Sequence, residues 1–233
     1  MTVSDDLFEK QIAYLDRRHE IVSLENTLQH VARGARLKRP IAAVTFDDGY
    51  RSVLTAAKPI LDRAGISAHC FVCTDHVGTE QRFPHDDDVP VREFLDVMSW
   101  DELRELQRAG WGIGAHTASH ARLSECAGDA LEYELRAPVD ALHNRLGVER
   151  PVLAYPFGGR EDISPEARTR VPHHGYVACL SDYGGENRPG DALFELCRID
   201  IGGDHSGLAW KVMADGVSLR RLADSARRRI RPS

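Results

Sequence analysis

Two neighbouring carboxylates in this sequence are placed where they could do chemistry. Asp47 and Asp48 follow the apolar run IAAV at 41–44 and stand directly before Gly49, where a turn is expected. Neighbouring residues of a strand point to opposite sides, so one carboxylate can hold a metal ion while the other faces a substrate as a base. A buried charge without a partner is costly, which argues against the plain alternative of an acidic turn.

Two histidines form a second candidate group. His116 and His120 follow the predicted strand WGIGAH at 111–116, and their i, i+4 spacing lets both bind one ion. Such a pair also arises by chance on protein surfaces, but here it lies at a strand end one α/β unit after the Asp-Asp pair. Two imidazoles with a carboxylate suit Zn²⁺ and tolerate other divalent first-row ions. A bound ion would make hydroxide available near neutral pH.

A third strand end has the sequence AYPFG at 154–158. Pro156 and the following glycine are ordinary turn residues, so a plain loop is one interpretation. The functional interpretation is a groove wall, with aromatic rings against a sugar and a backbone N–H directed at a developing oxyanion. We therefore predict that Tyr50, Pro156 and Phe157 contact a substrate.

The elements that must position these residues alternate between strands and helices, which predicts a single α/β domain over 1–233 with parallel strands and outer helices. The polar segment 76–98 is expected to be a loop beside the site. Prolines 59 and 138 are expected to bend their helices. Helices are predicted over 5–18, 24–34, 52–65, 99–110 and 124–146, from 164 and from 218, and strands near 21–22, 41–44, 66–74, 111–116, 151–155, 176–180 and 195–201.

Composition narrows the class of protein. The chain has 233 residues, 42% of them hydrophobic, and a net charge of −6, which gives no reason to expect a nucleic-acid partner. No apolar run reaches the ~18 residues of a membrane span, and the N-terminus lacks the apolar core of a signal peptide. The five scattered cysteines suggest a reducing, cytoplasmic location. Cys70 and Cys73 lie in an apolar strand-like run and are expected to pack in the core rather than bind zinc.

The three strand ends together resemble the polysaccharide deacetylase family, also called the NodB-homology family or carbohydrate esterase family 4. The resemblance spans about residues 8–201. It implies a distorted, incomplete (β/α)7-type barrel and a metal-dependent hydrolase that removes acetyl groups from N-acetylated sugars of a polysaccharide or glycan precursor. The matching stretches are TFDDGY at 45–50, HTASH at 116–120, AYPFG at 154–158 and MSWDELRELQRAGWGIGAH at 98–116.

The resemblance also implies a role for each matching residue. Asp47 corresponds to the catalytic base, and Asp48, His116 and His120 correspond to the ligands of a divalent metal, Zn²⁺ first, with Co²⁺ or Ni²⁺ as alternatives. Tyr155 corresponds to the residue whose backbone N–H stabilises the oxyanion. The expected partner is an N-acetylated glycan.

One part of the family pattern is missing. The C-terminal Leu-x-His motif that supplies the general acid in many members has no counterpart, and the segment after Asp182 resembles a circularly permuted branch that includes poly-N-acetylglucosamine deacetylases. That branch carries its acid histidine on an N-terminal strand, just upstream of the region that resembles residues 8–24. Either the sequence starts downstream of that strand, or the protein works without that histidine. His205 is the best internal substitute, ahead of His173 and His174. Lack of that strand would expose a sheet edge and favour a homo-oligomer.

Two other functions stay open at the level of sequence. One is a hydrolase of the same fold that acts on a small amide or imide. The other is a sugar-binding domain that keeps the metal without turnover, although such a domain has no need of the base Asp47.

Overall fold

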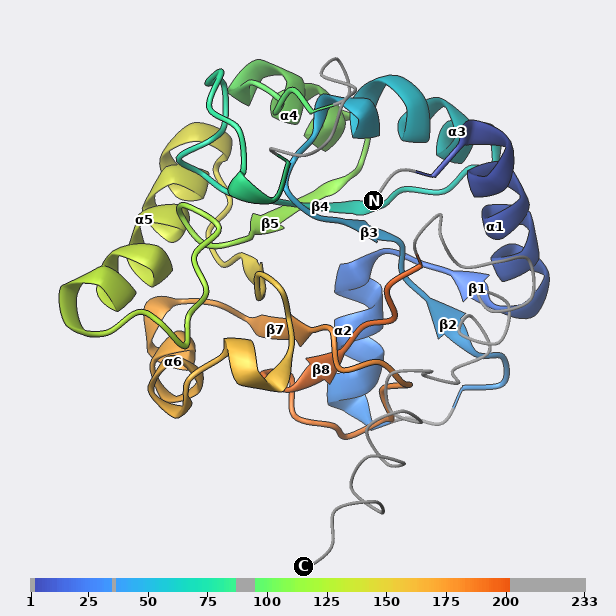
Figure 1. Ribbon diagram of the computed structural model, residues 1–233. Helices are drawn as coiled ribbons and strands as arrows, with labels where there is room; N and C mark the ends of the chain where they lie inside the picture. Colours follow the sequence, from blue (N-terminus) through green and yellow to red (C-terminus); the bar gives the residue numbers. More distant parts are fainter. Residues whose placement is uncertain (1–2, 35–36, 87–94, 202–233) are drawn as a thin grey trace, which may run out of the picture.

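A six-stranded parallel sheet carries the fold. The computed structural model describes residues 3–34, 37–86 and 95–201. The sheet curls into a half-barrel with the strands in chain order, as Figure 1 shows. This confirms the predicted incomplete α/β barrel. Its strands are β3 (Thr45–Phe46), β4 (His69–Val72), β5 (Gly112–Ala115), β6 (Val152–Ala154), β7 (Ala178–Ser181) and β8 (Leu196–Cys197).

Helices connect the strands, and most of them begin at a serine cap. Ser4 and Ser23 accept backbone N–H groups at the start of the first two helices, and Ser99 forms a capping box with Glu102. The α-helices are α1 (Asp5–Arg18), α2 (Leu24–Arg33), α3 (Lys58–Arg63), α4 (Trp100–Arg108), α5 (Gly128–Leu146) and α6 (Pro165–Arg170). A π-helix, η1 (Val53–Ala57), and the short 3-10 helices η2 (Pro84–Asp86), η4 (Arg160–Asp162) and η5 (Val171–His174) complete the set.

The two faces of the sheet pack against different helices. Residues 70, 72, 153, 155 and 179 belong to one core cluster, which also contains the buried leucines of α4 and α5. The alternate residues 71, 152, 154, 178 and 180 belong to a second cluster with Leu24, Leu28 and Val31 of α2. Side chains alternate along a strand, so the first face is the outer one and α2 packs against the inner one.

The observed elements depart from the sequence prediction at several places. The segment 41–46 is two strands: β2 (Ile41–Ala42) pairs with β1 (Glu20–Ile21) in a separate parallel pair, and only β3 joins the main sheet. A π-helix stands before Pro59, which lacks an N–H and disfavours a regular turn there. α5 begins at residue 128 rather than 124, and the backbone N–H of Ser124 donates to the carbonyl oxygen of Asp162. The helix predicted from residue 218 lies outside the described residues.

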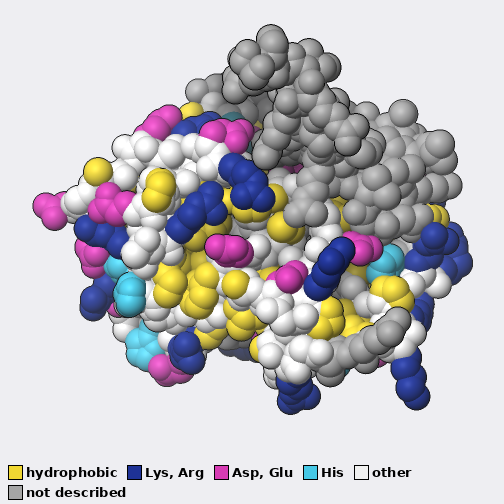
Figure 2. All heavy atoms as spheres, turned by 90° about the horizontal axis from the view of Figure 1, so that it is seen from below, with side chains coloured by type: hydrophobic (Ala, Val, Ile, Leu, Met, Phe, Trp, Pro, Cys, Tyr) yellow, Lys and Arg dark blue, Asp and Glu magenta, His cyan; other side chains and the backbone are white. Residues whose placement is uncertain are grey.

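The core and the surface agree with the composition. Cys70 and Cys73 are buried and unpaired, which confirms their predicted place in the core. On the face drawn in Figure 2, basic and acidic side chains surround a central group of hydrophobic ones. Charges of both signs are mixed on this face, so it has no large patch of one charge. None of the described helices is long and apolar enough to cross a membrane.

Candidate active site

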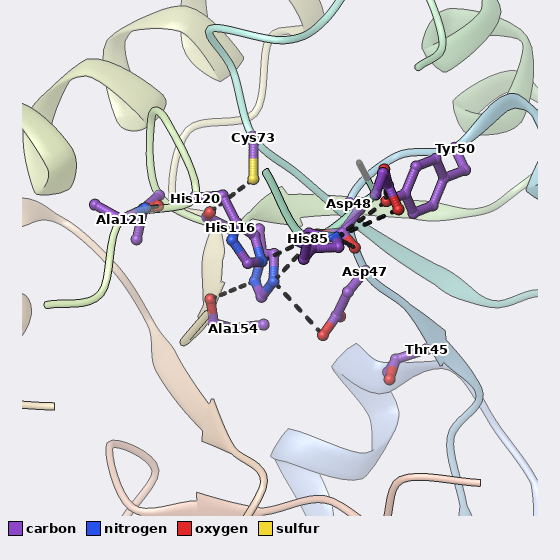
Figure 3. Close-up of polar contacts among 12 residues, drawn as sticks. Thr45, Asp47, Asp48, Tyr50, Cys73, His85, His116, His120, Ala121 and Ala154 are labelled. Carbon is purple, nitrogen blue, oxygen red and sulfur yellow. Dashed lines mark hydrogen bonds and ion pairs between the residues drawn. The ribbon is translucent and has the colours of Figure 1, made fainter. Parts of the chain in front are cut away.

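Three of the predicted side chains meet at the carboxyl ends of β3 and β5. Asp48 Oδ1 lies 3.6 Å from Nε2 of His116 and 3.3 Å from Nε2 of His120. All three ligand atoms lie within 4.8 Å of one another, and Figure 3 shows the side chains turned toward a common point. The predicted convergence of a carboxylate and two imidazoles is therefore present in the structure.

The chemistry of these three groups fits a cation. His116 Nδ1 lies 2.8 Å from the carbonyl oxygen of Ala154, which only an N–H can satisfy, so Nε2 presents its lone pair to Asp48. Asp48 Oδ1 is buried without a hydrogen-bond partner. A buried carboxylate oxygen facing two imidazole nitrogens lacks the positive charge that would compensate its burial, and a divalent ion supplies it.

The protonation states of His120 and Asp48 also suit the binding of a cation. Burial lowers the pKa of His120 to about 4, so His120 is neutral near pH 7. Burial works against ionisation of Asp48, but hydrogen bonding to His85 outweighs it and lowers the pKa of Asp48. An ionised carboxylate and neutral imidazoles are the forms that ligate metals.

The backbone of the three motifs is strained in the same way. The described residues other than glycine that have positive φ are Asp48 at 67°, Thr117 at 62°, His120 at 66° and Phe157 at 60°. Left-handed conformations are costly for such residues and persist where surrounding structure enforces them. All four belong to the motifs that the sequence singled out. Next to Asp48, a Cβ on Gly49 at φ 75° would come within 2.9 Å of Val72, so the turn requires glycine.

A buried carboxylate on α5 holds the histidine loop in place. Glu134 accepts hydrogen bonds from the backbone N–H groups of Ala118 and Ser119, both at 3.0 Å, and from the Ser119 hydroxyl at 2.6 Å. Glu134 is 6% exposed. This residue was not predicted from the sequence. Its signal would have been a glutamate at the inward a/d-type spacing of leucines 131, 135 and 142.

Asp47 is paired with an arginine from the far end of the sheet. The Arg198 guanidinium donates to both carboxylate oxygens of Asp47, at 2.6 and 2.7 Å, and to Thr45 at 3.3 Å. Burial works against ionisation of Asp47, but the charge of Arg198 and the hydrogen bonds that it donates outweigh it and lower the pKa of Asp47 to about 2. The pair joins β3 to β8, the two edges of the half-barrel. No signal in the sequence links residues 151 positions apart.

The backbone N–H of Tyr155, the predicted oxyanion donor, is hydrogen-bonded within the sheet in this structure, and its role stays a prediction. The backbone N–H of Tyr155 donates to the carbonyl oxygen of Leu180 at 3.0 Å, as part of the β6–β7 ladder. Its ring belongs to the outer core and is 3% exposed, so it does not line a groove. Strand alternation is the cause, because position 155 continues the outward-facing series of β6.

The other predicted site residues lie in different surroundings. Phe157 is 43% exposed, with its ring centroid 4.9 Å from that of His120, so it stands beside the site. Pro156 is buried in the turn. The Tyr50 hydroxyl is bonded to Asp86 at 2.6 Å. His205, the suggested acid, lies outside the described residues.

A third histidine at the site was not predicted. His85, in the segment 76–98, has Nε2 3.5 Å from Asp48 Oδ2 and 3.1 Å from the Tyr50 hydroxyl. Its ring centroid lies 4.8 Å from that of His120. The described part of this segment therefore does lie beside the site, as predicted. No spacing in the sequence distinguishes this histidine from the others.

Comparison with solved structures identifies the fold. IcaB from Ammonifex degensii superposes with a TM-score of 0.75 at 24% identity, covering 92% of this chain and 89% of that one. The Streptococcus pyogenes deacetylase PplD, solved with acetate, gives a TM-score of 0.74 at 20% identity, covering 91% of this chain and 87% of that one. The half-barrel is thus the NodB-type deacetylase fold.

Comparison of sequences identifies the family. The sequence model described as polysaccharide deacetylase matches residues 34–178, and the chain belongs to that family. A poly-β-1,6-N-acetyl-D-glucosamine N-deacetylase of Staphylococcus aureus is 27% identical over 172 residues, which is 69% of this chain. The chain spans just over half, 55%, of the length of that relative.

Proposed function

We propose that the protein is a metal-dependent hydrolase that removes acetyl groups from a polymer of N-acetylglucosamine. The observation that carries the proposal is the position of the carboxylate of Asp47, ionised and fixed by Arg198, beside the group formed by Asp48, His116 and His120. Membership of the polysaccharide deacetylase family supports deacetylation. The named activity of the staphylococcal relative suggests the polymer.

Asp48, His116 and His120 would hold the metal. Two imidazoles and a carboxylate leave coordination positions open and favour Zn²⁺, with Co²⁺ or Ni²⁺ also suited. A divalent ion in this place supplies two effects: it lowers the pKa of water and polarises the acetamide carbonyl.

Asp47 is placed to act as the base. Its Oδ2 lies 3.8 Å from Nε2 of His116, so the carboxylate borders the metal-ligand group. The two bonds from Arg198 fix the plane of the carboxylate, and each oxygen keeps a second lone pair to accept a proton from the attacking water. Once protonated, Asp47 loses its ion pair with Arg198, which favours passing the proton to the leaving amine.

The test is acetate release from N-acetylglucosamine oligomers. The protein is stripped of metal with a chelator and then reloaded with Zn²⁺, Co²⁺ or Ni²⁺. We expect acetate only from the reloaded protein. Asp47→Asn is expected to lower the rate by at least about a hundredfold while metal binding persists, because the proton acceptor is removed and Asp48, His116 and His120 are kept.

Asp62→Asn, on the exposed side of α3, is the matched control and should leave the rate unchanged. Equal rates for Asp47→Asn and the wild type would contradict the assignment of the base. A metal-loaded protein that binds the oligomers but releases no acetate would be a binding domain. Hydrolysis of small amides alone would indicate the other enzyme class.

A further inference from the structure

His85 is held against the site by aromatic packing. The segment that contains it continues from Phe83 into η2, and the rings of Phe83 and His85 stack with centroids 5.2 Å apart. Phe83 is fully buried and also packs edge-on against His120, at 5.4 Å. The imidazole of His85 therefore has a defined place beside the metal-ligand group, as Figure 3 shows.

The hydrogen bonds around His85 fix which atom donates. The Tyr50 hydroxyl has one proton and gives it to the buried carboxylate of Asp86, at 2.6 Å. The same hydroxyl oxygen lies 3.1 Å from Nε2 of His85 and can only accept there. Nε2 of His85 must consequently carry a hydrogen, and that N–H also faces Asp48 Oδ2 at 3.5 Å. An imidazole nitrogen that carries a hydrogen is not a metal ligand.

The two carboxylate oxygens of Asp48 therefore face different groups. Its Oδ1 faces His116 and His120 and has no hydrogen-bond partner, whereas its Oδ2 faces the N–H of His85. A carboxylate with both oxygens free can bind a cation through both, and a donor on one oxygen removes that option.

We propose that His85 is a positioning residue that engages Oδ2 of Asp48 and so restricts this carboxylate to binding the metal through Oδ1 alone. This inference rests on the metal site of the proposed function. One-oxygen binding by Asp48 leaves more of the coordination shell open to water and to the carbonyl of a substrate. Among the described residues, this assigns a role to the one imidazole at the site that the metal-ligand group does not use.

The test distinguishes the effect of the His85 N–H donor from the effect of its ring stacking on Phe83. His85→Phe keeps the stacking on Phe83 and removes the N–H, whereas His85→Gln keeps an N–H donor of similar reach. His143→Gln changes an exposed histidine on α5 and is the matched control. Zn²⁺ affinity is measured by competition with a chromophoric chelator, and the visible absorption spectrum is recorded for each Co²⁺-loaded protein.

We expect His85→Phe to weaken Zn²⁺ binding by about tenfold, the effect typical of residues that orient a metal ligand. Its Co²⁺ spectrum should weaken in intensity, because binding through both oxygens raises the coordination number. His85→Gln should retain most of the affinity and the wild-type spectrum. Tyr50→Phe, which removes the acceptor that orients the imidazole, should change both readouts in the same direction by less, and it tests the proposal if His85→Phe does not fold.

Wild-type affinity and spectrum in His85→Phe would overturn the inference while leaving the proposed metal site intact. A loss above about a thousandfold in His85→Phe, with no recovery in His85→Gln, would make His85 a ligand and also overturn it. A wild-type protein that does not bind Zn²⁺ would refute the proposed metal site itself. In that case, the acetate-release assay shows whether the protein also lacks deacetylase activity.

Discussion

The ion pair between Arg198 and Asp47 gives the sharpest prediction about stability. Its side chains are only 17% and 30% exposed, and the two groups share two short hydrogen bonds. Arg198 holds the pKa of Asp47 at about 2, against an ordinary value of 3.8. A difference of that size corresponds to about 2.5 kcal/mol of unfolding free energy at neutral pH. We expect Arg198→Met to lower the stability of the metal-free protein by about 2–3 kcal/mol at pH 7.

The sign of the pH dependence follows from the direction of the pKa shift. Because folding lowers the pKa of Asp47, the stabilisation is complete above about pH 4 and is lost as the pH falls toward 2. The difference between wild type and Arg198→Met should therefore shrink over this range. Urea denaturation followed by circular dichroism at pH 7 and at pH 3 measures both quantities.

Arg51→Met is the matched control for this experiment. Arg51 also contacts two carboxylates, Asp96 and Glu102, but its side chain is 40% exposed. An exposed pair contributes less than about 1 kcal/mol. Equal losses in the two variants, or a loss in Arg198→Met that is the same at pH 3 as at pH 7, would refute the reasoning.

Two further substitutions test the supports of the site. Glu134→Gln replaces an acceptor oxygen with an amide and should weaken Zn²⁺ binding by about tenfold, measured by chelator competition, whereas Glu132→Gln on the exposed side of α5 should not. An unchanged affinity in Glu134→Gln would show that the histidine loop holds its shape without it. Gly49→Ala places a Cβ 2.9 Å from Val72 at positive φ and should cost about 2–4 kcal/mol in urea denaturation. Gly34→Ala, at φ 66° with open space around it, should cost only about 1–2 kcal/mol, and equal losses would exclude the steric explanation.

The sequence by itself determined the fold class and the three side chains that could hold a metal ion. Parallel strands end at one edge of the sheet, so motifs that directly follow strands must meet there. Asp48, His116 and His120 each stand within five residues of a predicted strand end, and local order alone placed them together. The glycine after the Asp-Asp pair and the serine caps of the helices are likewise local features that one sequence contains.

Only the tertiary structure decided which groups complete the site. Arg198 reaches Asp47 because the sheet curls and brings its two edges together. The two residues are 151 positions apart, so no periodic pattern in the sequence indicates their contact. His85 and Glu134 come from a loop and from a helix, and their partners depend on how those elements pack. The surroundings of Tyr155 likewise depend on packing: its motif is local, but the alternation of β6 turns its ring outward and the pairing with β7 engages its N–H. Local patterns fix where a chain turns, whereas packing fixes which side chains then face one another.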